Sequence, residues 1–258
     1  MLRSRSLVVW GVAVVLLAGC GSDGSTGSPG AAAGDGDVGG HGDAHIVMSG
    51  WRGCDVFDDL VPLQDFLGAV GTGEYGLSDS DPSAMERPSC QATLDLATFV
   101  NDLGTSTVET TGEAVVSLSL TTMLSEDEAA ADYRSAWDQM NSSDIERTDV
   151  QEGSLDGDWD ESYVFSGNRE MRFDIFVLAR YEHWYLKFSL DVRHDPGRAA
   201  FERHPDLYPG GSADAMAVYP FTSPELLEWV TDEYFPQIYS NIVDRVDVEV
   251  CDMTPNRC

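Results

Sequence analysis

The chain has 258 residues, of which 45 are Asp or Glu and 15 are Lys or Arg, so its formal net charge is −30 at pH 7. A surface this acidic repels the phosphate backbone of nucleic acids and the headgroups of anionic lipids. We therefore expect no nucleic-acid partner. The acidic charge does not indicate any particular function, because most charged surfaces serve only to keep a protein soluble.

The N-terminal segment has the pattern of an export signal. Arg3 and Arg5 precede an apolar run over residues 7–17, which is too short to span a bilayer but has the length of a signal-peptide core. The run ends in Leu-Ala-Gly-Cys, which resembles a bacterial lipoprotein box. This resemblance implies that residues 1–19 are removed and that Cys20 carries a diacylglyceryl group. The alternative is an ordinary secretory signal with an incidental cysteine.

A lipidated Cys20 would leave the protein attached to the outer face of the cell membrane, because two acyl chains hold a protein on a bilayer where one is marginal. Residues 20–50 are rich in Gly, Ser, Ala and Asp, and we expect them to form a disordered tether. His41 and His45 lie in this tether, where their spacing predicts no metal site. Residues 51–258 are long enough to form one folded domain.

Within the domain, the first expected helix covers residues 60–70 and ends at Gly71 and Gly73. An acidic loop over residues 78–89 follows, and then a strand over residues 90–97. Residues 113–124 alternate between apolar and polar side chains, which is typical of a half-buried strand. We expect one face of this strand to be buried, made of Ala114, Val116, Leu118 and Leu120.

A second helix is marked by a capping box, in which Glu128 follows Ser125 by three residues. Its apolar stripe consists of Ala130, Tyr133, Trp137 and Met140. An aromatic stripe at helical spacing could form a ligand wall, but packing on a sheet is the commoner use. The sequence therefore predicts that this helix covers part of a sheet.

Three strands are expected over residues 161–166, 169–179 and 182–192, with a hairpin turn at 166–168 and a further strand within 145–153. After a loop over residues 194–222, Ser223 is the expected N-cap of a last helix. Its buried stripe comprises Leu226, Leu227, Val230, Tyr234, Ile238 and Ile242, and Pro236 predicts a kink. The predicted fold class is α+β, an antiparallel sheet with helices packed on it in a single domain.

The lipoprotein box, the Gly-rich tether, the Cys-Asp-Val-Phe run at 54–57 and the later Cys90 together resemble a family of actinobacterial lipoproteins of unknown function. In that family a Cys-Asp-Leu-Leu type motif opens the domain and a later cysteine precedes a strand. The resemblance implies location and fold, with no established activity. Its pattern favours the disulfide Cys54–Cys90, leaving Cys251 with Cys258 among the three connectivities that four cysteines allow. A four-cysteine zinc site is the alternative, but neither pair has the close spacing of such sites.

The run Asp156-Gly-Asp158-Trp-Asp160 places three carboxylates at alternate positions, as calcium loops do. A calcium loop beginning at Asp156 would need Gly at its sixth position and an acid at its twelfth, where this chain has Glu161 and Gly167. The pattern therefore indicates a solvated acidic turn, with a weak divalent-cation site as the alternative. We expect no other metal and no cofactor.

No nucleophile elbow, zinc-protease motif, P-loop or dinucleotide fingerprint occurs in the chain. Alternation over residues 181–188 predicts instead that one strand face presents Tyr181, His183, Tyr185 and Lys187, which suits a protein or small-molecule partner. Phe176 and Leu178 could share that face, and a covering helix or loop is the alternative. We expect a non-enzymatic, membrane-anchored extracytoplasmic binding module, with an unrecognised envelope hydrolase as the alternative.

Overall fold

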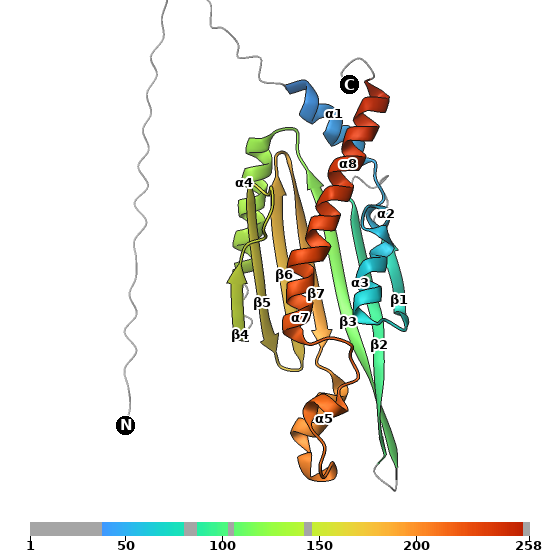
Figure 1. Cartoon of the computed structure of the whole chain (residues 1–258). Coiled ribbons are helices and arrows are strands. Elements are labelled where there is room, and N and C mark those ends of the chain that lie inside the picture. The colour runs from blue at the N-terminus through green and yellow to red at the C-terminus, as the bar shows by residue number, and fades with distance from the viewer. Residues whose placement is uncertain (1–37, 80–86, 103–105, 142–145, 255–258) are drawn as a thin grey trace, which may run out of the picture. The chain divides into compact units, whose positions relative to one another are not determined.

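An antiparallel sheet of seven strands is the centre of the structure (Figure 1). The computed structural model describes residues 38–79, 87–102, 106–141 and 146–254. The spatial order of the strands is β1-β2-β3-β7-β6-β5-β4. Their bounds are β1 Gly71–Asp79, β2 Ser89–Asp102, β3 Thr107–Thr122, β4 Thr148–Gly153, β5 Glu161–Arg169, β6 Arg172–Tyr181 and β7 Trp184–Arg193.

The sheet consists of two meanders joined at its centre, where β3 pairs with β7. Because the chain passes from β3 to the far edge strand β4 through a helix, the second meander returns toward the centre and places β7 beside β3. Every pair of neighbouring strands is antiparallel. The predicted α+β class with an antiparallel sheet is confirmed.

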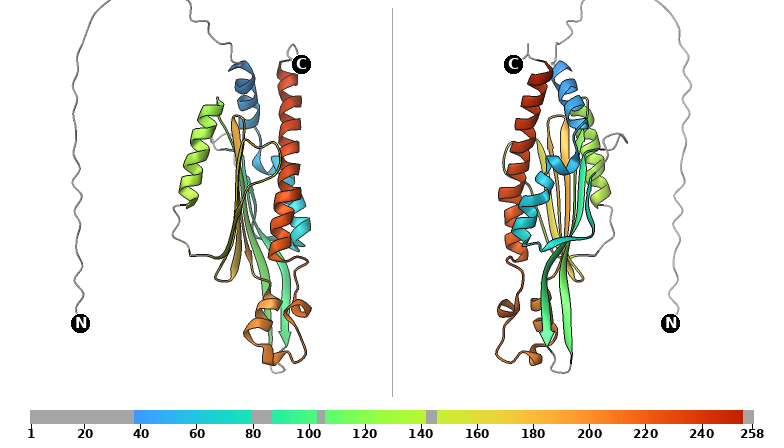
Figure 2. Two further views of the ribbon diagram at one scale, coloured as in Figure 1. Left: turned by 60° about the vertical axis from the view of Figure 1, so that its left-hand side comes forward. Right: turned by 90° about the vertical axis from the view of Figure 1, so that its right-hand side faces the viewer.

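Helices cover the two faces of this sheet unequally (Figure 2). One face packs against most of the helical residues, and of the described helices only α4 lies on the other. The helices on the first face and at its upper end are α1 Val38–Ser49, α2 Gly53–Val56, η1 Asp58–Leu60, α3 Val61–Leu67, α7 Ser223–Trp229, the π-helical turn η4 Val230–Tyr234 and α8 Phe235–Met253. The helix on the second face is α4 Glu126–Asn141.

The main core lies between the sheet and α8. The predicted inward face of β3 is fully buried at Ala114, Val116, Leu118 and Leu120. Phe188 on β7 contacts Tyr234 and Phe235, with ring centroids 6.1 and 5.6 Å apart. Aromatic side chains dominate such a core because each buries a large apolar area.

The last helix begins one residue earlier than predicted. Thr222, and not Ser223, is the N-cap, because its hydroxyl accepts from Glu225 N while the Glu225 carboxylate accepts from Thr222 N. This is the reciprocal capping box. Pro236 was predicted to kink the last helix. In the structure the π-helical turn η4 directly precedes α8, Pro236 lies in the first turn of α8, and the backbone on both sides of η4 stays helical.

The segment predicted as a loop over residues 194–222 contains short helices, α5 Pro196–Arg203, η3 Pro205–Leu207 and α6 Ala213–Met216. The buried Asp195 holds this insertion together. Its carboxylate accepts from the backbone N–H groups of Gly197, Arg198, Val218 and Tyr219 at 2.7–2.9 Å. The Asp195 carboxylate thus caps the N-terminus of α5 and also binds the backbone at Val218 and Tyr219.

The tether prediction is wrong for residues 38–50. This stretch forms α1, and Ala44, Val47 and Met48 are buried. Their spacing of three and four residues puts them on one helix face. The domain therefore begins before Trp51. Cys20 and residues 1–37 lie outside the described residues, as do the acidic residues 80–86.

Two predicted turns move by a few residues. The first long helix ends at Gly68, which has φ 61°, whereas Gly71 lies in β1. A left-handed C-cap is the conformation that glycine adopts without strain. The hairpin between β5 and β6 turns at Glu170 and Met171, so the predicted turn residues 166–168 lie inside β5.

The capping box of α4 is confirmed in part, since Ser125 Oγ accepts from Glu128 N at 3.3 Å. The predicted stripe is partly wrong. Ala129 and Tyr133 are the buried residues, Ala136 and Met140 pack beside them, and Trp137 is 38% exposed. Trp137 instead contacts Tyr163 at the edge of the helix, with ring centroids 5.9 Å apart.

Buried tyrosines make the fold sensitive to alkali. Burial raises the pKa of Tyr133 to about 12 and also raises the pKa values of Tyr219 and Tyr234. Since unfolded tyrosine ionises near pH 10, the preference of Tyr133 for the neutral phenol stabilises the fold below about pH 10 and is lost between about pH 10 and 12.

For Tyr133 alone the loss is about 3 kcal/mol. We expect denaturant midpoints measured against pH to be flat near neutrality and to fall steeply through that window. The variant Tyr133→Phe should show a shallower fall. Reversible ionisation of all nine tyrosines near pH 10 without unfolding would contradict this expectation.

Candidate functional site

The predicted binding face is largely covered, because α4 lies on it. Tyr185 is 3% exposed and meets Tyr133 of α4 edge to face, with ring centroids 6.2 Å apart. Leu178 is fully buried in the same cluster. The prediction of an open face is therefore wrong for Tyr185 and Leu178, and the alternative of a covering helix is right.

The other predicted face residues divide between different places. Tyr181 pairs with Trp184 across the β6–β7 turn and packs toward α8 on the opposite side of the sheet. His183 is buried in that turn. Lys187 remains on the predicted face, where it is half-buried. Of the four residues, only Lys187 lines an open surface.

A polar cluster at Asp132, near the middle of α4, fixes this helix to the sheet. Arg87 donates to Tyr185 Oη and to Asp132 Oδ2, both at 3.1 Å, and Tyr185 donates to the same carboxylate at 2.8 Å. Burial is the largest cause that raises the pKa of Tyr185. The cluster sets the position of α4, and that position leaves open the two hollows described next.

The first hollow, which we call the α4 pocket, lies between the C-terminal end of α4 and the strands β4, β5 and β6. Its volume is about 420 Å³, within the range of small-ligand sites. Its lining residues are Gln139, Met140, Asn141, Arg147, Val150, Tyr163, Phe165 and Phe176. Most of this surface is apolar or aromatic, and Arg147 is the one charged residue among the described residues that line it.

Arg147 is held in the α4 pocket from two sides. Its guanidinium carbon lies 5.1 and 5.4 Å from the ring centroids of Phe165 and Phe176, which is cation–π distance. Its Nε donates to Asp174 Oδ2 at 3.1 Å. The side chain is 11% exposed, so the charge lies at the wall of the pocket and not in bulk solvent.

Asp174 belongs to a chain of alternating charges on the same sheet face. Arg169 Nε lies 3.7 Å from its carboxylate, and Arg169 and Arg172 both bind Asp191, the cross-strand neighbour of Asp174. Burial raises the pKa of Asp174, and the two neighbouring arginines oppose that rise. The bond to Asp174 therefore fixes the Arg147 side chain, and its guanidinium lies over the rings of Phe165 and Phe176, which line the pocket.

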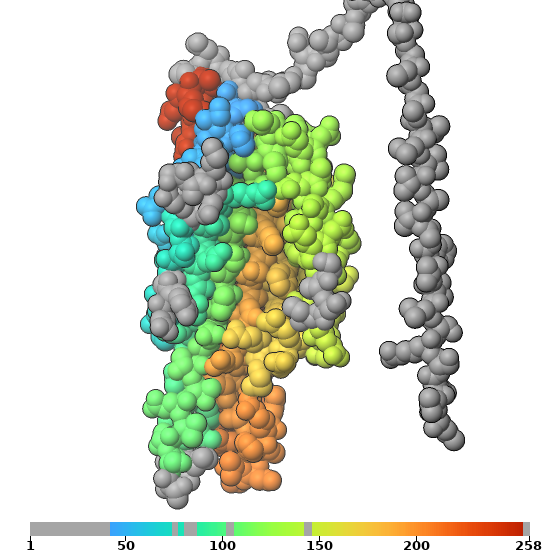
Figure 3. Space-filling model, turned by 180° about the vertical axis from the view of Figure 1, so that it is seen from behind, coloured from blue at the N-terminus to red at the C-terminus, as the bar shows by residue number. Residues whose placement is uncertain are grey.

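The second hollow, which we call the serine groove, is a shallow surface over β2, β3 and β7 on the other side of α4. Figure 3 shows the orange atoms of β7 uncovered between the green strand β3 and the lime-green α4. The groove is lined by Arg87, Ser89, Gln91, Ser117, Ser119, Lys187 and Ser189. Its side chains are hydroxyls, one amide and two cations.

A third hollow, of about 480 Å³, lies between α5, the lower end of the sheet and the start of α7. Asn168 donates to Asp149 at 3.0 Å, and its Oδ1 lies 3.2 Å from His194 Nε2. His194 therefore donates from Nε2 in this arrangement. Thr222 and Ser223 also line the hollow, but no hydroxyl bonds to His194 among the described residues. A nucleophile–base pair is the feature that acyl-transfer catalysis requires.

The acidic turn does not form a cation site in the described part of the chain. Asp160 instead binds the protein, since it accepts from Glu182 N at 2.5 Å and lies 3.2 Å from Arg180. Asp156 and Asp158 are exposed. The predicted solvated turn describes these two residues, whereas Asp160 has a structural role.

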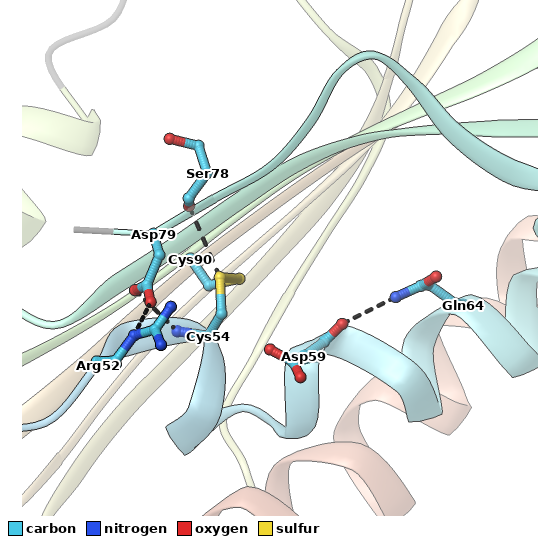
Figure 4. Close-up of a disulfide and its surroundings, with 7 residues drawn as sticks. All are labelled: Arg52, Cys54, Asp59, Gln64, Ser78, Asp79 and Cys90. Atoms are coloured by element: carbon cyan, nitrogen blue, oxygen red, sulfur yellow. Dashed lines mark hydrogen bonds and ion pairs between the residues drawn. A yellow bond between two sulfur atoms is a disulfide. The ribbon is translucent and has the colours of Figure 1, made fainter. Parts of the chain in front are cut away.

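The disulfide Cys54–Cys90 is confirmed and joins α2 to β2, with the two Cα atoms 4.6 Å apart (Figure 4). Both half-cystines are buried. Asp79 on β1 accepts from Cys54 N at 3.2 Å and from Arg52 Nε at 2.9 Å. Cys251 is also disulfide-bonded, and Cys258, its predicted partner, lies outside the described residues.

Sequence reasoning missed most of the α4 pocket. Arg147 and Val150 come from the segment that begins β4, and Phe165 comes from β5; the β4–β5 pairing brings them together beside the end of α4. A short strand beginning with Thr148 gave no signal that the arginine before it would lie over two phenylalanine rings. For the serine groove a signal was present, since Ser117 and Ser119 formed the polar side of the alternating strand.

In the described residues, no helix is both long enough and apolar enough to cross a membrane. No protein-family model, curated protein or solved structure matches this chain. The likeness to actinobacterial lipoproteins therefore stays a prediction, and the case for function depends on the surfaces of the chain itself.

Proposed function

We propose that this protein is a lipid-anchored binding module on the extracytoplasmic face of the cell membrane and that its ligand enters the α4 pocket. The lipoprotein box at Cys20 supports the location. The observation that carries the binding role is the aromatic lining of the pocket, with Arg147 fixed over Phe165 and Phe176. A hollow of this size with few polar groups suits a small apolar molecule.

The surface around the pocket supports the same conclusion. Val150, which lines the pocket, is 46% exposed, and Trp137, which contacts the lining residue Tyr163, is 38% exposed. Single exposed apolar residues are common on proteins, but an apolar rim that continues into an aromatic hollow is the arrangement expected at a binding site. Buried apolar area supplies most of the binding free energy at such a site.

The binding role predicts a specific effect of a charge at the pocket rim. Wild-type protein should bind the neutral fluorescent probe N-phenyl-1-naphthylamine with one site, and Val150→Asp should weaken that binding about ten-fold or more, because a carboxylate at the rim must lose water. The measurement is a fluorescence titration at neutral pH.

Val108→Asp is the matched control, since Val108 lies in a strand at 47% exposure, and no described pocket includes it. Both variants should unfold within about 0.5 kcal/mol of wild type, as surface substitutions usually do. Equal probe binding by Val150→Asp and wild type, or equal loss in both variants, would refute the proposed site.

The hollow around His194 does not support the alternative of a hydrolase. Its hydrogen-bond chain runs from Asp149 through Asn168 to the histidine, but the described residues supply no nucleophile bonded to that ring. We therefore propose the binding role alone.

A further inference from the structure

The α4 pocket and the serine groove are neighbours on the sheet. Ser189 in the groove and Phe176 in the pocket are direct cross-strand partners on β7 and β6. Direct partners have β-carbons about 5 Å apart. One row of the sheet therefore runs from hydroxyl and amide groups into phenylalanine rings, in the order Gln91, Ser117, Ser189, Phe176 and Phe165.

The next row repeats this change of character. Ser89 and Ser119 pair across β2 and β3, Ser119 pairs with Lys187, and Lys187 pairs with the buried Leu178. The polar part thus ends at the same boundary between β7 and β6 in both rows. An apolar hollow and a polar floor lie side by side on one rigid sheet.

The charge of the groove is opposite to the charge of the chain. Acidic residues outnumber basic ones by 45 to 15 in the sequence, yet the charged residues that line the groove are Arg87 and Lys187. Arg87 already binds Asp132. Lys187, the only lysine in the sequence, forms no ion pair within the described residues. A local cationic site on an acidic protein favours an anionic group.

From these observations we infer that the ligand is an anionic amphiphile, such as a phosphate-bearing lipid, whose apolar tail occupies the α4 pocket and whose headgroup lies on the serine groove beside Lys187. This inference rests on the proposed function, because it needs the pocket to bind the tail. The hydroxyls of Ser117 and Ser189 supply further hydrogen-bond donors to phosphate oxygens.

Two single-chain amphiphiles with the same tail and opposite charge test the inference. Below their micelle concentrations, dodecyl phosphate should displace N-phenyl-1-naphthylamine at least about five-fold more tightly than dodecyltrimethylammonium. The field of a chain with net charge −30 alone predicts the opposite order. Inorganic phosphate should not displace the probe, because it has no tail, and this arm separates a lipid headgroup from free phosphate.

The variant Lys187→Gln should weaken dodecyl phosphate binding about five-fold while leaving probe binding unchanged, and Lys187→Arg should retain the phosphate preference. Arg134→Gln is the control, since it removes the same charge from an exposed position of α4 outside both hollows. Added salt should weaken dodecyl phosphate more than the probe.

The outcomes separate the two proposals. If dodecyl phosphate binds no better than the ammonium amphiphile, or if Lys187→Gln and Arg134→Gln have equal effects, the anionic-amphiphile inference is overturned while probe binding still supports the pocket. Displacement of the probe by inorganic phosphate alone would also overturn it. If wild-type protein fails to bind the probe at all, the proposed function falls as well.

Discussion

Replacing both Cys54 and Cys90 with serine is expected to lower the free energy of unfolding by about 4 kcal/mol. The bond closes a loop with a sequence separation of 36, and the chain-entropy relation gives this value for such a loop. For a domain of this size the melting temperature should fall by roughly 8 to 16 °C. Calorimetry or denaturant titration of the oxidised proteins measures the difference.

The structure indicates where the damage would begin. α2 is one turn long and cannot be stable alone, so its position depends on the bond to β2 and on the contacts of Asp79. In reducing buffer the wild type and the double variant should have nearly equal stability. A double variant as stable as oxidised wild type would mean that the cross-link contributes nothing to the fold.

The sheet could be predicted because its signals are local and periodic. In β3 the buried side alternates with the exposed side from Ala114 to Leu120, as the sequence indicated. Short connections between β5, β6 and β7 made those pairings antiparallel. The pairing of β3 with β7 was not predictable in the same way, since it joins segments separated by α4 and three strands.

The predicted binding face failed for two physical reasons. Periodicity shows which residues share a side of a strand, but it does not show what covers that side, and α4 covers Tyr185. The prediction also assumed that the alternation of sides continues from residue 181 to residue 188, although a turn interrupts the strand there. Residues 182 and 183 connect β6 to β7, so Tyr181 shares a side with its partner Trp184 and not with Tyr185.

The domain was predicted to start too late, at residue 51, because the glycine-rich composition of residues 21–50 was given more weight than the helical spacing of the apolar residues within it. Residues 21–40 are so rich in glycine that the whole stretch to Gly50 resembles a linker, yet Ala44, Val47 and Met48 already have helical spacing. Tertiary burial of that short apolar face stabilises α1 where intrinsic propensity is poor.

Gly53→Ala is expected to destabilise the protein by about 3 kcal/mol. A β-carbon at Gly53 would overlap the backbone of Ser89, the first residue of β2, which pairs with Ser119 of β3, so relieving the overlap would disturb this end of the sheet. This close approach of α2 to β2 is also what brings Cys54 within bonding distance of Cys90. In the background lacking the disulfide the same substitution should cost less, since α2 is then free to move away, and this coupling is measurable in a double-mutant cycle.

Gly42→Ala is the matched control, because a β-carbon there has no neighbour within 4 Å. Gly42 lies inside α1, where alanine is favoured over glycine by about 1 kcal/mol, so this variant should be slightly more stable than wild type. An unchanged stability would mean that α1 is not part of the folded domain. If Gly53→Ala were as stable as Gly42→Ala, the close packing of α2 on β2 would be wrong.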